Sequence, residues 1–235
     1  MSKKMRIAVI GDSTVEWIRP YRDHKNDFTY SELLMKNDSY AVDIYIKPGM
    51  TSHDALILIW QELMGKFYDY YIFSFGINDC TPRSYPKIMA DFYNASLIPN
   101  TKMQKLFFLF YRLFTATKVQ RIASKLKISR PWTDLKTFEK NIKRIINILT
   151  KETDAKMIFL SIPQTSKRVE DILCNINGLI LEYSEIIKKH ASLSVDMDSL
   201  FSEDYEKYIS EGIHYSSEGH RLVYKEILAR LDNNV

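Results

Sequence analysis

The sequence MRIAVIGDST, residues 5–14, sets the first expectation about the fold. Its short apolar run, Met5–Ile10, has the length and composition of a buried strand. Gly11, Asp12 and Ser13 then favour a turn, and a helix can begin directly after it. A strand that leads through a polar turn into a helix is typical of an α/β protein.

The rest of the chain repeats this alternation. We expect strands at Met5–Ile10, Val42–Ile46, Tyr70–Phe75, Met157–Ile162 and Ser194–Met197. Helices are expected at Tyr30–Lys36, Ser52–Gly65, Tyr85–Tyr93, Thr133–Thr150, Asp171–His190 and Ser216–Leu231. Strands that alternate with helices imply parallel βαβ units, so the sequence predicts a five-stranded parallel sheet inside a three-layer α/β/α sandwich.

Length and composition fit a single domain spanning residues 1–235. The chain is 46% hydrophobic and 26% charged, which excludes a disordered protein and a membrane bundle. No stretch reaches the roughly 18 uninterrupted apolar residues of a membrane-spanning helix. The apolar run near the first residue is too short for a signal peptide, so we expect a cytoplasmic protein. Cys80 and Cys174 have no metal-binding spacing, and we expect both to be free thiols and the protein to hold no metal.

The basic residues are concentrated in one segment, an expected helical insertion at about residues 100–131. No Asp or Glu occurs between Phe92 and Thr133, whereas eight basic residues do: Lys102, Lys105, Arg112, Lys118, Arg121, Lys125, Lys127 and Arg130. Within this segment, Val119, Ile122, Ala123 and Leu126 repeat at helical spacing and are expected to face inward.

Three interpretations of the insertion remain open. It can be a pair of helices packed on the domain with a solvated basic face, or a lid over the active site. It can also attach residues 102–128 to an anionic membrane surface. The first two are favoured. We expect no nucleic acid partner, because no recognised binding module accompanies the charge.

Polar residues follow three of the predicted strands and precede the last helix. They are Gly11–Thr14, Pro48–Ser52, Gly76–Asp79 and Glu211–His214. Parallel strands end at one edge of a sheet, so the first three groups should lie side by side. Asp12 and Asp79 are expected to brace their turns by accepting hydrogen bonds from backbone N–H groups.

These groups contain what acyl transfer requires. Ser13 is a candidate nucleophile, and a serine hydroxyl needs a neighbouring base, for which His214 is suited. Glu211 can orient the other ring nitrogen of that histidine. The backbone N–H groups of Ser13 and Gly49, with the side-chain amide of Asn78, can stabilise an oxyanion.

The four motifs in this order resemble the SGNH hydrolases, the GDSL-type esterases. The resemblance covers nearly the whole chain, and it implies a flavodoxin-like fold and no cofactor. It also implies Ser13 as nucleophile, His214 as base, and an oxyanion hole made by Ser13, Gly49 and Asn78. One departure is Glu211, where the family usually has Asp. Its carboxylate either orients His214 or points away and leaves a Ser–His dyad.

The expected function is therefore that of a carboxylic ester hydrolase. The resemblance implies removal of a short acyl group, such as acetyl, from a carbohydrate or a lipid-linked glycan in polysaccharide biosynthesis. Two alternatives remain open. One is an O-acyltransferase that uses the same residues, and the other is a non-catalytic glycan-binding module in which Glu211 marks a decayed site. The sequence leaves the oligomeric state open.

Overall fold

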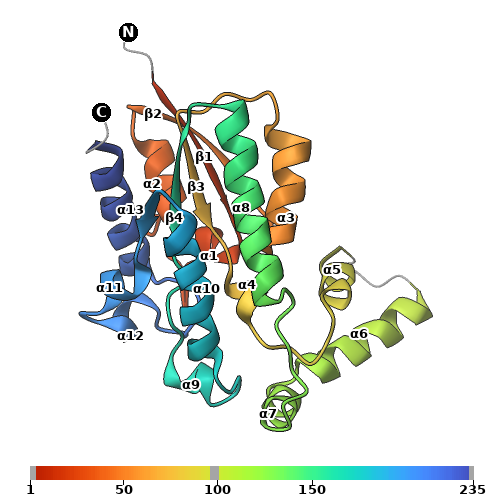
Figure 1. Ribbon diagram of the computed structural model, residues 1–235. Helices are drawn as coiled ribbons and strands as arrows, with labels where there is room; N and C mark the ends of the chain where they lie inside the picture. The colour runs from red at the N-terminus through yellow and green to blue at the C-terminus, as the bar shows by residue number, and fades with distance from the viewer. Residues whose placement is uncertain (1–3, 96–100, 233–235) are drawn as a thin grey trace.

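Five parallel strands form the sheet at the centre of the protein, as seen in a computed structural model that describes residues 4–95 and 101–232 (Figure 1). They are β1 (Met5–Gly11), β2 (Tyr40–Ile46), β3 (Tyr70–Ser74), β4 (Lys156–Leu160) and β5 (Leu193–Val195). Their order is β2-β1-β3-β4-β5, and every neighbouring pair is parallel. The predicted five-stranded parallel sheet is confirmed.

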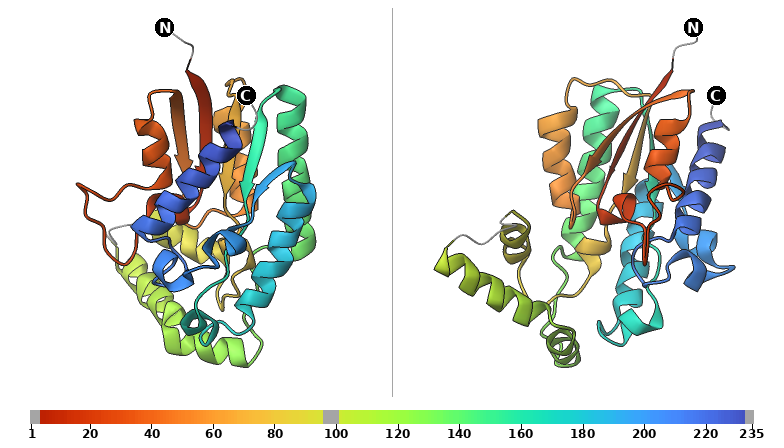
Figure 2. Two further views of the ribbon diagram at one scale, coloured as in Figure 1. Left: turned by 90° about the vertical axis from the view of Figure 1, so that its left-hand side faces the viewer. Right: turned by 180° about the vertical axis from the view of Figure 1, so that it is seen from behind.

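Helices cover both faces of the sheet (Figures 1 and 2). One layer contains α3 (Ser52–Leu58), its π-helical continuation η1 (Ile59–Leu63), α8 (Leu135–Glu152) and α10 (Ile176–His190). The other contains α2 (Tyr30–Lys36), α13 (Ser217–Asp232) and the short helices α11 (Met197–Phe201) and α12 (Tyr205–Tyr208). The predicted three-layer α/β/α sandwich is therefore confirmed.

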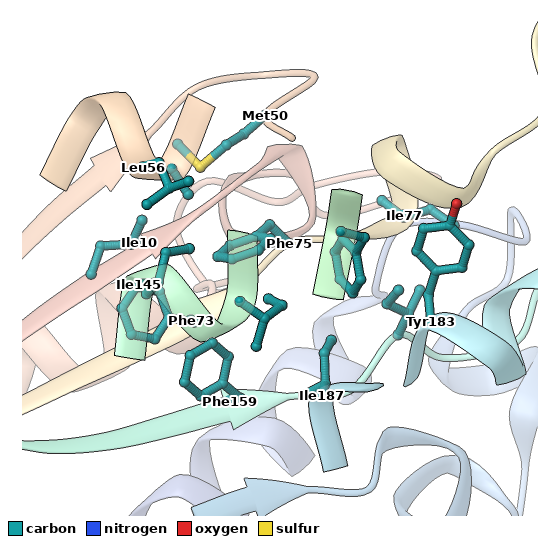
Figure 3. Close-up of a cluster of buried hydrophobic side chains, with 14 of the residues drawn as sticks. Ile10, Met50, Leu56, Phe73, Phe75, Ile77, Ile145, Phe159, Tyr183 and Ile187 are labelled. Atoms are coloured by element: carbon teal, nitrogen blue, oxygen red, sulfur yellow. The ribbon is translucent and has the colours of Figure 1, made fainter. Parts of the chain in front are cut away.

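Each face of the sheet has its own hydrophobic core. Successive side chains of a strand point to opposite faces, so Ala8 and Ile10 join one core while Ile7 and Val9 join the other. Figure 3 shows the first core, where Phe73 of β3 stacks on Phe159 of β4 with ring centroids 4.5 Å apart. All five residues of β3 are buried, as a central parallel strand requires.

Some helix and strand ends differ from the predicted ones. The last helix of the first layer begins at Ile176 instead of Asp171, because Asn175 before it has the left-handed φ of 64°. The segment upstream forms a separate short helix, α9 (Lys167–Glu170). Strand β5 ends at Val195, because the next residue, Asp196, caps helix α11 with its side chain. These differences arise from caps and turns, which hydrophobic periodicity does not reveal.

Where the structure describes it, the segment between β3 and α8 forms four helices beyond the carboxyl ends of β1 and β3 (Figure 1). They are α4 (Ile77–Cys80), α5 (Lys87–Ala95), α6 (Lys102–Thr115) and α7 (Thr117–Lys125). Asn100, where the insertion was expected to begin, lies outside the described residues. Arg83 and Arg130 form an antiparallel bridge that closes the base of this segment, with N–O distances of 2.9 and 3.0 Å.

The predicted inward face of α7 is confirmed for Ala123 but wrong for Ile122 and Leu126. Ile122 and Leu126 are 58% and 65% exposed, whereas Gln120, Ala123 and Ser124 are buried. Hydrogen bonds set this orientation, because Gln120 donates to Ser84 Oγ (2.7 Å) and Ser124 Oγ accepts from Cys174 N, between α9 and α10 (2.8 Å). The helix is thereby rotated so that two apolar side chains face solvent.

Candidate active site

Ser13 lies at the carboxyl end of β1, where the strand passes into helix α1 (Ser13–Glu16). Asp12 caps this helix, since its Oδ1 accepts hydrogen bonds from Thr14 N (2.9 Å) and Thr14 Oγ1 (2.7 Å). Strands β1 and β3 are neighbours whose connections lead to opposite faces of the sheet, and ligands of α/β proteins bind at such a point. The half-buried Ser13 therefore occupies the expected place for a site.

A line of hydrogen bonds runs from Ser13 through His214 to Glu211. Ser13 Oγ lies 3.0 Å from His214 Nε2, and Glu211 Oε1 is in close contact with His214 Nδ1. The same carboxylate oxygen accepts a hydrogen bond from the backbone N–H of His214 (3.2 Å). Because Nδ1 donates its proton to the carboxylate, Nε2 is left as an acceptor for the serine hydroxyl.

Glu211 reaches the histidine although its side chain is one methylene longer than that of Asp. The hydrogen bond from His214 lowers the pKa of Glu211 below its usual value, so this carboxylate stays ionised at neutral pH. Of the two orientations that the sequence left open, the structure has the one in which Glu211 faces the ring.

Close packing fixes the loop that carries these two residues. Gly212, between them, has a φ of 97°, and a Cβ there would lie 2.3 Å from Ser166 Oγ. Arg168 Nη2 donates to the Glu211 carbonyl (2.9 Å). The ring of Trp17 lies 5.1 Å from the His214 ring, centroid to centroid. The packed loop and the Trp17 ring together hold the imidazole in the orientation that faces Ser13.

Asn78 is held by an acceptor on one side and a donor on the other. Its Nδ2 donates to Asp12 Oδ2 (2.9 Å), and its Oδ1 accepts from Arg83 Nη2 (3.0 Å). This pattern assigns the amide orientation, because the reverse would place two donors together. A side-chain amide nitrogen carries two hydrogens, so one remains for a ligand beside Ser13.

Gly49 lies in the turn that follows β2, the other neighbour of β1. The turn is closed by a hydrogen bond from Met50 N to Lys47 O (2.9 Å) and joined to β1 by one from Lys47 N to Gly11 O (3.1 Å). Gly49 has a φ of 77°, which L side chains rarely adopt. In the described part of the chain, neither the Gly49 N–H nor the Ser13 N–H donates to an acceptor. Both donors are therefore available to a ligand.

Buried Asp79 ties the end of β3 to the start of α3. Its two carboxylate oxygens accept from Ser52 N (3.0 and 2.9 Å), and one also accepts from Ser52 Oγ (2.7 Å). Burial raises the pKa of Asp79 to about 7, and burial is also the main cause of the raised pKa of Asp12. Asp12 braces its own turn by accepting from Thr14 N, as the sequence predicted, whereas Asp79 accepts from the backbone N–H of Ser52 on another element. These hydrogen bonds fix the turns that carry Ser13 and Asn78.

Two residues of this site were missed by the sequence analysis. Arg83 follows Asn78 by five residues, and Trp17 follows Ser13 by four, but neither belongs to a motif or a periodic pattern. Their contacts depend on how the loops fold back, which local sequence does not show. Within residues 4–95 and 101–232, no three or more His, Cys, Asp or Glu side chains are grouped as a metal site.

Comparisons with known proteins show which fold this is. No protein-family model and no curated protein matches the chain. Solved structures do match over nearly its whole length. The lipase/acylhydrolase from Enterococcus faecalis is 18% identical, with a TM-score of 0.58 and 96% of each chain covered. An acetylxylan esterase from Geobacillus stearothermophilus is 15% identical, with a TM-score of 0.57, covering 96% of this chain and 93% of its own. The acetyl xylan esterase AlAXEase is 15% identical, with a TM-score of 0.59 and coverages of 96% and 99%. The SGNH-type fold that the sequence motifs imply is thereby confirmed.

Proposed function

We propose that this chain is a serine carboxylic ester hydrolase in which Ser13 is the nucleophile, His214 the general base and Glu211 the orienting acid. The observation that carries the proposal is the 3.0 Å contact between Ser13 Oγ and His214 Nε2, with the Glu211 carboxylate on the opposite ring nitrogen. This is the relation of nucleophile, base and orienting group that acyl transfer by a serine needs.

The reaction follows from this geometry. His214 Nε2 takes the Ser13 proton as Oγ attacks the ester carbonyl, and Glu211 stabilises the imidazolium that forms. The resulting oxyanion is bound by the N–H groups of Ser13 and Gly49 and by Asn78 Nδ2, each contributing about 3 kcal/mol. His214 then protonates the leaving alcohol. Water attacks the acyl-enzyme in the second step, again with His214 as base.

Asp12 and Arg83 are positioning residues in this proposal. Asp12 turns one amide hydrogen of Asn78 toward itself and leaves the other for the oxyanion. The guanidinium of Arg83 on Asn78 Oδ1 draws electron density from the amide, which strengthens its N–H groups as donors. Arg83 is itself fixed by stacking over Trp132 at 4.2 Å and by a hydrogen bond to Tyr85 Oη (3.1 Å).

The substrate proposed is a short acyl ester, in particular an acetyl ester of a carbohydrate. Support comes from the names of matched structures, since two of those cited above are acetylxylan esterases. The intact set of Ser13, Asn78 and His214 favours catalysis over a non-catalytic glycan-binding module.

The test is hydrolysis of p-nitrophenyl esters of increasing chain length and of acetylated xylo-oligosaccharides. Ser13→Ala and His214→Ala are expected to abolish turnover while circular dichroism shows an unchanged fold. The exposed residues Ser202 and His24 supply matched controls, and Ser202→Ala and His24→Ala should retain full activity. If the Ser13→Ala variant kept the activity of the wild type, Ser13 would not be the nucleophile. An acetylated product on an added sugar acceptor would identify an acyltransferase instead.

A further inference from the structure

Helix α6 has two apolar faces, and among the described residues only one of them packs on the protein. The packed face contacts α5: Phe107 and Phe92 have ring centroids 4.6 Å apart, as do Phe108 and Tyr93, and Tyr111 stacks on Tyr93 at 4.2 Å. These contacts fix the rotation of the helix about its axis, and so they determine which side chains face away.

The other face of α6 is exposed. It consists of Met103 (75% exposed), Leu106 (49%), Leu109 (55%), Phe110 (49%) and Leu113 (53%). These positions are three or four residues apart and form one stripe along the helix. The outer face of a helix on a water-soluble domain is normally polar. A contiguous apolar stripe marks a surface that binds something.

Basic residues on α6 and α7 accompany this stripe. Lys102, Lys105 and Arg112 lie on α6, and the exposed side of α7 carries Lys118, Arg121 and Lys125 beside the exposed Ile122 and Leu126. No Asp or Glu occurs between residues 93 and 132. Two acidic residues of another segment, Glu170 and Asp171, line a hollow together with Arg121 and Lys125. None of these six cations forms an ion pair with the part of the chain that the structure describes.

We propose that α6 and α7 dock this protein on an anionic membrane surface. Apolar side chains flanked by lysine and arginine suit the boundary between lipid headgroups and acyl chains, where both the negative charge and the apolar depth are available. A second copy of the chain suits the surface less well, because it would bring two unbalanced clusters of cations together.

The helices rest on the membrane and do not cross it. Helix α6 has 14 residues, so it is about 21 Å long, against about 30 Å for the hydrocarbon core of a bilayer. Among the described helices, none is long and apolar enough to span a bilayer. Both α6 and α7 lie at the carboxyl-end side of the sheet (Figures 1 and 2). Docking therefore brings Ser13's end of the molecule to the lipid surface.

The test is co-sedimentation of the full chain with vesicles of phosphatidylcholine, alone or with about a third of phosphatidylglycerol. The wild type should bind the anionic vesicles, bind the neutral ones at least tenfold more weakly, and be released by high salt. Each lysine or arginine near such a surface contributes about a fivefold factor in binding. Arg121→Gln/Lys125→Gln should therefore weaken binding about 30-fold.

The apolar contribution is tested with Leu106→Gln/Phe110→Gln/Leu113→Gln, which leaves the face packed on α5 intact and should reduce binding to the level of neutral vesicles. Matched controls far from α6 and α7 are Met35→Gln/Phe67→Gln for exposed apolar residues and Lys151→Gln/Lys225→Gln for charge, and both should bind like the wild type. The proposal is independent of catalysis, so Ser13→Ala should bind vesicles like the wild type.

Three results would overturn the proposal: no binding of the wild type to anionic vesicles, equal binding to neutral and anionic vesicles, or full binding by the α6 and α7 variants. Sedimentation velocity without lipid tests the second-copy alternative. A dimer that the triple α6 variant abolishes, together with no vesicle binding, would assign the stripe to self-association.

Discussion

Replacing Asp12 with Asn should disable the oxyanion hole while leaving the shape of the site almost unchanged. Asp12 Oδ2 accepts from Asn78 Nδ2 (2.9 Å), and Oδ1 accepts twice from Thr14. In Asp12→Asn the remaining oxygen stays with Thr14, so the new NH₂ group faces the NH₂ group of Asn78. The Asn78 amide cannot resolve the conflict by flipping, because Arg83 would then face an NH₂ group as well.

The magnitude follows from what is lost. The Asn78 amide can then no longer face both the new NH₂ group at position 12 and the Arg83 guanidinium, so it leaves its position. One of the three groups that donate hydrogen bonds to the oxyanion is thereby misplaced. Loss of one such donor costs about 3 to 4 kcal/mol of transition-state stabilisation, or a factor of about 100 to 1000 in kcat. KM should change little, because the donor acts on charge that develops only in the transition state.

The assay is steady-state hydrolysis of p-nitrophenyl acetate by wild type, Asp12→Asn, Asn78→Ala and the double variant, with exposed Asp171→Asn as the matched control. Because both single changes remove the same donor, the double variant should be no slower than Asn78→Ala. The proposed positioning of Asn78 by Asp12 would be refuted if Asp12→Asn kept more than about a third of wild-type kcat. It would also be refuted if the kcat losses of the two single variants multiplied in the double variant.

Three further predictions concern Glu211, Arg83 and His220. Glu211→Gln should lower kcat about 1000- to 10000-fold, as expected when the group that orients and stabilises a catalytic histidine is neutralised. Steady-state hydrolysis of p-nitrophenyl acetate measures this loss, and an unchanged kcat would mean that Ser13 and His214 act as a dyad without Glu211. Arg83→Met should lower kcat about tenfold with KM within about threefold, because Asn78 loses one charge-assisted hydrogen bond. A raised KM with unchanged kcat would point to a role in substrate binding instead. His220 is buried, with its Nδ1 accepting from Tyr30 N (3.3 Å), and burial lowers its pKa to about 4. As pH falls from about 6.5 toward 4, only the unfolded chain takes up this proton, so the stability that neutral His220 provides is lost by about 1.4 kcal/mol per pH unit. The free energy of unfolding of wild type relative to His220→Gln, from urea titrations, should therefore fall by about 2 kcal/mol between about pH 7.5 and pH 5. If the difference in unfolding free energy between the two proteins did not depend on pH, His220 would not be a buried neutral group. Asp79 has the opposite pH effect, but both proteins contain it, so it cancels in the comparison.

Much of the fold could be predicted because its signals are local. The strands β1 to β5 are short apolar runs, and α2 was predicted with its observed bounds, Tyr30–Lys36. The parallel arrangement follows from alternation of strands and helices, and it places the turns after β1, β2 and β3 at one edge. This argument brings Ser13, Gly49 and Asn78 together, whereas His214, 201 residues from Ser13, was assigned from its chemistry and the family resemblance. The structure has the two side chains 3.0 Å apart.

The remaining features depend on long-range contacts or on balances that a sequence does not display. The hydrogen bonds of Gln120 and Ser124 outweigh the apolar pattern of α7 and turn Ile122 outward. The reach of Glu211 to His214 depends on the φ of Gly212. The insertion proved neither fully packed nor polar outside, since α6 packs on α5 by one face and exposes another apolar face.

The central claim is that Ser13 is a nucleophile activated by His214, and mass spectrometry of the protein treated with a fluorophosphonate tests it most directly. The account predicts one covalent adduct, localised to Ser13 by peptide mapping, that is absent from Ser13→Ala and strongly slowed in His214→Ala. A fully folded wild type that forms no adduct, or one that is modified at another serine, would contradict it.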